Sequence, residues 1–298
     1  MRHYYRFIIL SSLFLSSNVF AMKFFIDGLL WRATNSNNWV YVNSLTLPQQ
    51  TINYKTIDFN YAPGFRVGAS FDGGWGTTLA YTRFYTKTND TASGALQPSF
   101  VGSVTAKPTT AYLYSSGQVS QVIDYNIFDY GYGKAFHPVG EWMLQPRVGL
   151  MGGWINQSTE ASFQGSTSTN ESITNNFIGL GPKVGVDTSI TIMKYHEIEP
   201  TLVASFFASY LVGNWVIKDI TNVVPARRIS VTGSSMSWGA LTLQASMGLG
   251  LAYKSFSVNC VYELNDWFNQ NQFFDNDTGT HNNDLILQGL TLNVSYNF

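Results

Sequence analysis

Seven charged side chains carry the chemistry that this sequence could perform. They are Asp58, Arg66, Glu141, Arg147, Lys183, Asp187 and Glu263. All seven stand in segments where apolar and polar residues alternate, and each has the phase of the small polar residues. If these segments are strands that close into a barrel, the seven side chains all project into its interior. Charges of both signs could form a constriction that selects permeating solutes, or they could pair with one another and plug the interior.

The size of the barrel bears on the choice between a pore and a plug. A barrel of about ten strands is near the size at which side chains fill the interior, whereas open aqueous pores usually need about 16 strands. Mixed signs also favour pairing, because a charge that is buried without a partner is costly. The residues alone therefore favour a salt-bridged interior over a conducting pore for an isolated copy of the chain.

Catalysis has little support in this sequence. A Ser–His or Asp–His site needs a histidine with converging partners. His137 and His196 fall in expected periplasmic turns, and His281 falls in an expected external loop. The other long loops contain many serines but no second histidine. We therefore expect no catalytic residue and no enzyme activity.

A metal or cofactor site has no better support. Residues 275–279 read Asp-Asn-Asp-Thr-Gly, which resembles the start of a calcium loop. Such a loop also needs a bidentate glutamate at a fixed position downstream, and this sequence lacks it. We expect neither a metal nor a cofactor.

Period-two alternation identifies the elements that must position the charged side chains. In the last segment, Leu290, Leu292, Val294, Tyr296 and Phe298 alternate with small or polar residues. The same pattern recurs along the chain and is typical of strands with one apolar and one polar face. It predicts about ten strands, near residues 23–34, 56–71, 75–87, 119–135, 140–155, 174–190, 196–213, 237–253, 256–268 and 284–298.

The composition indicates which kind of β protein these strands form. Only 12% of the 298 residues are charged, 15% are aromatic and the mean hydropathy is −0.02. The polar strand faces carry mostly Gly, Ser, Thr and Asn, whereas the outer face of a soluble sandwich carries many charges. Apolar faces that end in aromatic residues are typical of an outer-membrane barrel with a polar lumen. We therefore predict an all-β, transmembrane, antiparallel β-barrel of about ten strands.

The same numbers exclude other classes of protein. Beyond the N-terminus, no run of about 18 apolar residues could form a transmembrane helix. The aromatic content excludes a disordered chain, and a single cysteine, Cys260, excludes a disulfide scaffold. With 17 Lys and Arg against 18 Asp and Glu, we expect no nucleic-acid partner, because such a partner needs a basic face.

The gaps between the expected strands alternate between long and short. The long gaps are 35–55, 88–118, 156–173, 214–236 and 269–283, and the short ones lie near 72–74, 136–139, 191–195 and 254–255. Barrels of this class have short periplasmic turns and long external loops, so we expect solvated extracellular loops and both chain ends on the periplasmic side. Two strands break the pattern. We expect a β-bulge near Phe128, and we expect Arg83 on the lipid face to reach toward the outer interface.

The N-terminus resembles an export signal. Arg2, His3 and Arg6 precede a short apolar run over residues 7–15, and Val19-Phe20-Ala21 supplies small residues before a cleavage site. The run is too short to span a bilayer. We expect residues 1–21 to be a signal peptide and residues 22–298 to form the barrel.

Several motifs follow one another along most of the chain after residue 21. They are Gly74-Trp75-Gly76 with Tyr81-Thr82-Arg83-Phe84, and the segments 144–150, 176–185, 267–272 and 287–292. Their order and spacing resemble the Legionella-type major outer membrane protein family of porin-like β-barrels. The resemblance implies an outer-membrane location, a barrel, and a porin or host-attachment role. It also implies cross-links through several cysteines, whereas this chain has only Cys260, expected to face lipid, so disulfide-linked oligomers are not expected here.

The C-terminal strand suggests a partner. Val294, Tyr296 and the terminal Phe298 are in phase, and together they resemble the recognition signal of the barrel-assembly machinery. The other expected partners are outer-membrane lipid, lipopolysaccharide and, as an open alternative, further copies of this chain.

Two functions remain open. The first is a porin-like protein that passes small solutes through a polar, charge-lined lumen, which rests on the family resemblance. The second is a structural or adhesive surface protein without an open pore, whose loops bind host or partner molecules. For that function the expected contact surface is loop 88–118, with Phe100, Tyr112, Leu113 and Tyr114. The residues alone support an outer-membrane barrel.

Overall fold

The chain folds into antiparallel strands. A computed structural model describes residues 21–34, 38–46, 49–72, 75–99, 114–224, 227–235, 239–275 and 279–298. The strands are β1 (Ala21–Thr34), β2 (Asn38–Thr46), β3 (Gln49–Thr56), β4 (Ala62–Asp72), β5 (Gly76–Pro98), β6 (Tyr114–Gly133), β7 (Phe136–Val139), β8 (Trp142–Gly165), β9 (Ser168–Thr191), β10 (Ile198–Val224), β11 (Arg227–Ser235), β12 (Ala240–Tyr253), β13 (Phe256–Asp275) and β14 (Gly279–Asn297). The described part of the chain contains no helix with the length and apolarity needed to cross a membrane.

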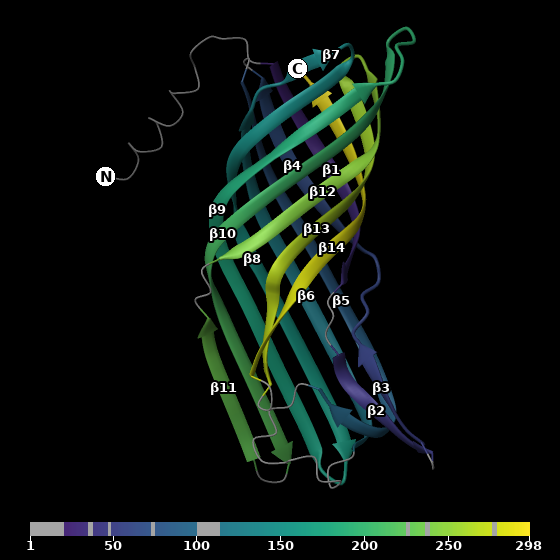
Figure 1. Ribbon diagram of the computed structural model, residues 1–298, viewed down its shortest axis with the longest axis vertical. Coiled ribbons are helices and arrows are strands. Elements are labelled where there is room, and N and C mark those ends of the chain that lie inside the picture. The colour runs from purple at the N-terminus through teal and green to yellow at the C-terminus, as the bar shows by residue number, and fades with distance from the viewer. Residues whose placement is uncertain are drawn as a thin grey trace, which may run out of the picture.

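Ten of these strands close into a barrel, as the sequence predicts. The order around the barrel is β1-β4-β5-β6-β8-β9-β10-β12-β13-β14, and β14 pairs with β1 to close the ring. Every neighbouring pair is antiparallel. The hairpin β2–β3 adds to the far end of β5, β11 adds to β10, and the short β7 adds to β8. Figure 1 shows the long barrel with β2, β3 and β11 at its lower end.

Short connections gather at one end of the barrel, which we call the turn end. They include residues 134–141 around β7, residues 192–197, and the two-residue turn at 254–255. His196 and Lys254 adopt the positive φ angles of tight turns, 55° and 52°. The last residue lies at this end too, because the backbone N–H of Phe298 donates to the carbonyl of Met22 at 2.8 Å. Figure 1 places the C-terminus and β7 together at the top.

At the opposite end several strands run far beyond the sequence-based expectation. We call this end of the barrel the distal extension; it comprises residues 83–98 of β5, 114–126 of β6, 155–165 of β8, 168–177 of β9 and 213–224 of β10. The prediction of long solvated loops is therefore wrong for most of 88–98, 114–118, 156–173 and 214–224, and the gap 35–55 contains β2 and β3. The Ser and Thr residues that suggested loops alternate here between an exposed outer face and a buried inner face. Threonine is β-branched and fits a half-buried strand, so the composition of a loop also suited a sheet.

The outer face of the barrel carries an apolar band. Its exposed members include Ile26, Leu30, Phe65, Val67, Leu79, Val148, Leu150, Ile178, Leu180, Val184, Phe206, Val212, Met247, Leu249, Leu292 and Val294. Exposed aromatic residues border it at the turn end, among them Trp75, Trp142, Tyr195, Tyr253 and Phe298. A band of this kind, bordered by aromatic residues, is the surface that barrels present to lipid.

Beyond the apolar band, the outward positions become polar. Arg83 follows Tyr81 on β5, and the outward residues of β6 change from Phe128 to Asn126 and Asp124. The register of β6 is continuous from Ser116 to Gly133 against both neighbours, so the expected bulge near Phe128 is wrong. The pattern changes there because the strand leaves the apolar band while keeping its phase. Arg83 is exposed at this border, on the outer face where the sequence places it.

Candidate functional site: the barrel lumen

The lumen is divided into two halves of different character. The half near the turn end contains two cavities of about 370 Å³ and about 630 Å³. Both are lined by Lys23, Arg147 and Asp187, so they adjoin one another. The half toward the distal extension is filled mainly by buried aromatic and aliphatic side chains, together with several buried polar ones. We call these the polar half-lumen and the aromatic half-lumen.

Arg66 is the centre of one ion-pair network at the boundary of the two halves. Strands β1, β4 and β13 bring together Asp27, Arg66 and Glu263, all with the inward phase. The guanidinium donates from Nη1 to Asp27 Oδ2 at 2.9 Å, and from Nη1 and Nη2 to the two Glu263 carboxylate oxygens at 3.0 and 2.9 Å. Its Nε donates to Thr82 Oγ1 at 3.0 Å. Four of the five guanidinium N–H groups thus donate, two of them to one carboxylate in the bidentate geometry that arginine favours.

Two further networks lie nearer the turn end. Lys183 Nζ lies 2.7 Å from Asp129 Oδ1, donates to Gln244 Oε1 at 2.7 Å, and lies 4.7 Å from the ring centre of Phe207. Arg147 Nε lies 2.7 Å from Asp187 Oδ2, and its two Nη atoms donate to Thr78 and Gln145 at 2.9 Å.

Lys23 differs from the other interior cations. It lines both cavities, but within the described residues no carboxylate lies within ion-pair distance of its ammonium group. Within the described residues, the charges that line the polar half-lumen therefore comprise four cations and four carboxylates, and among them only Lys23 has no ion-pair partner. The cations are Lys23, Arg66, Arg147 and Lys183, and the carboxylates are Asp27, Asp129, Asp187 and Glu263.

The structure brings five of the seven expected charges into the lumen: Arg66, Arg147, Lys183, Asp187 and Glu263. Sequence reasoning missed Lys23, Asp27 and Asp129. Asp129 was missed because the assumed bulge near Phe128 left the phase of this strand unassigned, although Asp129 alternates with the outward Phe128 and Tyr130. Lys23 and Asp27 share their phase with the buried Leu29 and Trp31. Because this inner face is mostly apolar, the alternation did not identify it as the lumen side.

Asp58 and Glu141 do not join the lumen, and their assignment is corrected. Asp58 is exposed between β3 and β4, while Ile57 and Phe59 on either side of it are buried. Glu141 is exposed in the turn before β8, where its carboxylate lies 2.9 Å from Lys194 Nζ. Both residues lie just outside a paired strand, where the strict alternation of sides no longer holds.

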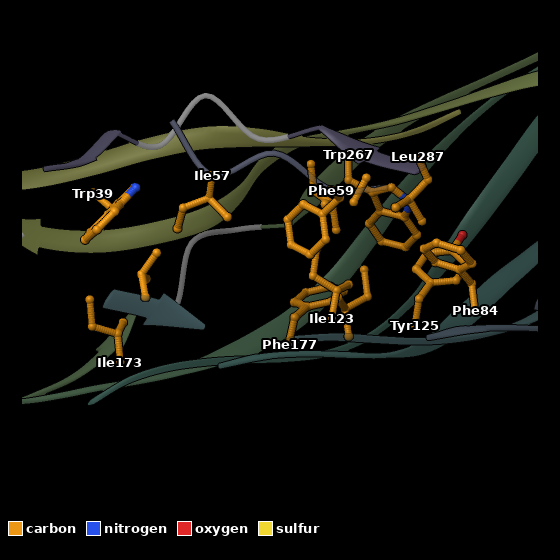
Figure 2. Packing of buried hydrophobic residues seen from close by; sticks show 14 of the residues in the cluster. Trp39, Ile57, Phe59, Phe84, Ile123, Tyr125, Ile173, Phe177, Trp267 and Leu287 are labelled. Carbon is orange, nitrogen blue, oxygen red and sulfur yellow. The ribbon is translucent and has the colours of Figure 1, made fainter. Parts of the chain in front are cut away.

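Six aromatic side chains form the aromatic seal of the lumen. They are Trp31, Phe84, Tyr125, Phe177, Trp215 and Trp267, and each is at most 2% exposed. Ring centres lie 5.8 Å apart for Trp31 and Phe84, 5.7 Å for Tyr125 and Trp267, and 4.4 Å for Phe177 and Trp215. In Figure 2 the rings of Phe84, Tyr125, Phe177 and Trp267 converge with Ile123 and Leu287 inside the barrel. Rings from six different strands thus meet across the bore, and they close it within the described residues.

A β-bulge in β13 helps to build the seal. The register against β14 shifts between Trp267 and Asn271, and Asn269 has a φ angle of 54°. As a result Trp267 and Gln270 are both fully buried. The carbonyl of Gln270 accepts hydrogen bonds from Gln157 Nε2 at 3.2 Å and Asn175 Nδ2 at 3.0 Å, on strands that are not neighbours of β13. The bulge therefore ties β13 to β8 and β9 across the interior.

A buried pair of carboxyl groups lies in the distal extension. Glu171 on β9 and Asp219 on β10 are 3% and 4% exposed, and their register makes them diagonal neighbours on the same inner face. Burial raises the pKa of Asp219 to about 6. Burial, followed by the charge of Asp219, raises the pKa of Glu171 well above its usual range. Two such carboxyls favour a state in which at least one is protonated at neutral pH.

The remaining sequence-based expectations concern the C-terminal strand, Cys260, metal ligands and the loops. Val294 and Tyr296 lie in β14 with the outward phase, beside Phe298, and Cys260 is exposed on the outward phase of β13. Within the described ranges, no three His, Cys, Asp or Glu side chains gather as metal ligands. The signal segment, loop residues 100–113, the turn residues Gly73 and Gly74, and residues 276–278 lie outside the described residues. The backbone of His281 lies in β14, but its side chain is outside the described part.

Comparisons with known proteins agree with this architecture. A family model described as "Legionella pneumophila major outer membrane protein precursor" matches residues 18–298. The crystal structure of the outer membrane protease OmpT from Escherichia coli is similar, with a TM-score of 0.52 at 11% identity, over 95% of this chain and 99% of that chain. The Pseudomonas putida toluene transporter TodX has a TM-score of 0.32 at 8% identity, over 93% of this chain and 89% of that chain. No curated protein matches the sequence. The likeness to OmpT concerns the fold alone.

Proposed function

The chain belongs to the Legionella pneumophila major outer membrane protein family and is an outer-membrane β-barrel, and from this premise we propose that it is porin-like. In this proposal small hydrophilic solutes enter the polar half-lumen from the periplasm, and the aromatic seal limits their passage to the outside. The proposal contains no catalytic step.

The polar half-lumen carries the proposal. Its two adjoining cavities, of about 370 Å³ and about 630 Å³, are large enough for small solutes and are lined by hydroxyl, amide and charged groups. Four cations and four carboxylates face this space, so we expect little preference for the sign of a permeating ion. A merely structural interior of a barrel this size would be filled by side chains.

The aromatic seal sets the expected size of the current. Around Phe177, ring centres lie 4.4 Å away at Trp215 and 6.2 Å away at Trp267, and all three rings are buried in the bore. We therefore expect rare or small conductance steps from the wild-type protein, because a ring must move before a solute can pass.

Planar-bilayer recordings of the refolded chain test the proposal. We compare the wild type with Trp267→Ala, which truncates the seal, and with Trp154→Ala, which removes an outward-facing ring of the apolar band. Trp267→Ala should increase the conductance several-fold, and Trp154→Ala should leave it unchanged. Heat-modifiable gel mobility checks that each variant is a closed barrel, and Phe177→Leu is a milder second truncation. If the wild type and both seal variants pass no current as folded barrels, the porin proposal is wrong.

The second candidate function is a non-conducting surface protein that binds partners outside the cell. One observation favours it: the distal extension continues β5, β6, β8, β9 and β10 well beyond the apolar band and has its own buried interior. A rigid sheet of this kind can present loops to a partner. An absence of current in the recordings above, together with loss of cell binding when residues 100–113 are deleted, would support this function.

A further inference from the structure

Three basic side chains gather on the outer face where the apolar band ends. On β1, Arg32 is the next outward residue after the exposed Leu30. On β5, Arg83 and Lys87 are outward and exposed, with the exposed Tyr85 between them. We call Arg32, Tyr61, Arg83, Tyr85 and Lys87 the basic border patch.

The register of the sheet keeps the patch compact. Strand β4 lies between β1 and β5; Arg83 is directly opposite Phe65, and Trp31 is opposite Ala62. The guanidinium carbon of Arg32 lies 5.9 Å from the ring centre of Tyr61, which is 53% exposed. The hydroxyl of Thr88 donates to the carbonyl of Asp58 at 2.7 Å and so holds the segment before β4 against β5, next to Lys87. Since neighbouring strands are about 5 Å apart, side chains from β1 and β5 can reach one headgroup over Tyr61.

The three cations of the patch have no carboxylate partner among the described residues. Elsewhere in this part of the chain most basic side chains are paired, as Lys55 is with Asp90, Lys194 with Glu141 and Lys254 with Glu197. Two acids lie near the patch. Asp124 on β6 is opposite Tyr85 and accepts a hydrogen bond from Asn126 at 2.9 Å, and Asp58 is exposed beside β5. Three cations against two carboxylates leave the patch with a net positive charge.

On the opposite flank of the barrel, the described outward side chains have the reverse balance. Beyond the apolar band on β8, β9, β10, β13 and β14, the charged ones are Glu160, Lys218, Asp266 and Asp284, which are three acids and one base. Among the side chains that the structure describes beyond the apolar band, the net positive charge therefore lies at β1 and β5.

From this placement we propose that the basic border patch binds the phosphate groups on the headgroup of an outer-leaflet glycolipid. The patch lies at the distal border of the apolar band, where headgroups of that leaflet meet water. Arginine binds phosphate oxygens in a bidentate manner, and lysine adds a point charge. Tyr61 and Tyr85 place amphipathic rings at the headgroup level, and the apolar band below them covers the acyl chains. A phosphorylated glycolipid therefore fits both the charge and the depth of the patch.

Lipid retention tests the proposal. The chain is refolded into phosphatidylcholine vesicles that contain a fixed fraction of a bisphosphorylated glycolipid, extracted with mild detergent, and assayed for glycolipid per barrel. The triple variant Arg32→Gln/Arg83→Gln/Lys87→Gln should retain about tenfold less, because each basic residue near an anionic surface adds to binding. The matched control Lys134→Gln/Lys194→Gln/Lys254→Gln removes the same charge at the turn end and should retain as much as the wild type.

A second set of measurements varies the lipid and the competing anion. The same glycolipid without its phosphates should be retained poorly by every variant, and phosphatidylglycerol or millimolar inorganic phosphate should not compete with the bisphosphorylated form. Equal retention by the triple variant, equal retention of the phosphate-free glycolipid, or competition by phosphatidylglycerol or inorganic phosphate would overturn the proposal. Gel mobility before and after heating confirms that each variant is a closed barrel, so that a loss of lipid is not a loss of fold.

Discussion

The two halves of the lumen are built by the same ten strands and the same inward phase, yet they differ in what fills them. Near the turn end, Arg66, Lys183 and Arg147 meet carboxylates beside cavities of about 370 and 630 Å³. Toward the distal extension, Trp215, Trp267 and their neighbours pack ring against ring with no exposed surface. Alternation thus decides which side chains face inward, while the contacts across the bore decide whether the space is polar or filled by rings.

The largest expected effect comes from breaking the Arg66 network. Arg66→Met leaves the Asp27 and Glu263 carboxylates without their cation, and uncompensated buried charge costs about 4 kcal/mol. Urea unfolding of the refolded barrel in vesicles measures this loss. The triple variant Arg66→Met/Asp27→Asn/Glu263→Gln removes the charge together with its partners and should recover most of the stability. Equal stability of wild type and Arg66→Met would show that water already satisfies these carboxylates.

A somewhat smaller effect is expected in the aromatic half. Trp267→Ala removes a fully buried ring that contacts Tyr125 and Phe177, which costs about 3 kcal/mol. The same urea transition measures it. Trp154→Ala, on the lipid face at 37% exposure, is the matched control and should cost less. A larger cost for Trp154→Ala would mean that the rings inside the bore are loosely packed.

The third prediction is that the stability of the distal extension depends on pH. Both Glu171 and Asp219 have pKa values raised by burial, so folding favours their protonated forms. This stabilisation is complete below about pH 4, the unfolded value, and it decreases as the pH rises through about 6, the pKa of Asp219. Amide protection factors of β9 and β10 around residues 169–175 and 217–221 should fall roughly tenfold from pH 5 to pH 8. Protection factors are already corrected for the intrinsic pH dependence of amide hydrogen exchange.

The double variant Glu171→Gln/Asp219→Asn is the control for this pH effect. It should hold the same protection at both pH values, because neither amide titrates. Protection that rises with pH in the wild type would reverse the sign and refute the assignment.

The smallest effect is expected at the turn end. Glu141→Gln breaks the ion pair with Lys194, but both side chains are more than half exposed and water replaces the partner. The urea midpoint should stay unchanged within error. A clear loss of stability would show that turn-end pairs matter as much as the lumen pairs.

The sequence was most informative where strands lie in the apolar band. Leu290, Leu292 and Val294 face outward as their alternation predicts, and ten strands close the barrel. It failed at Asp58 and Glu141, which stand just outside paired strands, and at Asp129, where a bulge was assumed that does not exist. It also failed in the distal extension, since Ser and Thr suit a loop and a sheet equally when only one strand is considered.

The class of fold, the number of barrel strands, the lipid-facing side and five of the interior charges follow from the alternation alone, because a period of two and a lipid solvent act on each strand separately. The ion-pair partners, the meeting of six rings across the bore and the contact of Arg32 with Tyr61 appear only in the folded barrel. These depend on strands far apart in the chain, such as β1 with β13 or β13 with β9, and their relative heights follow from register and tilt once the ring has closed.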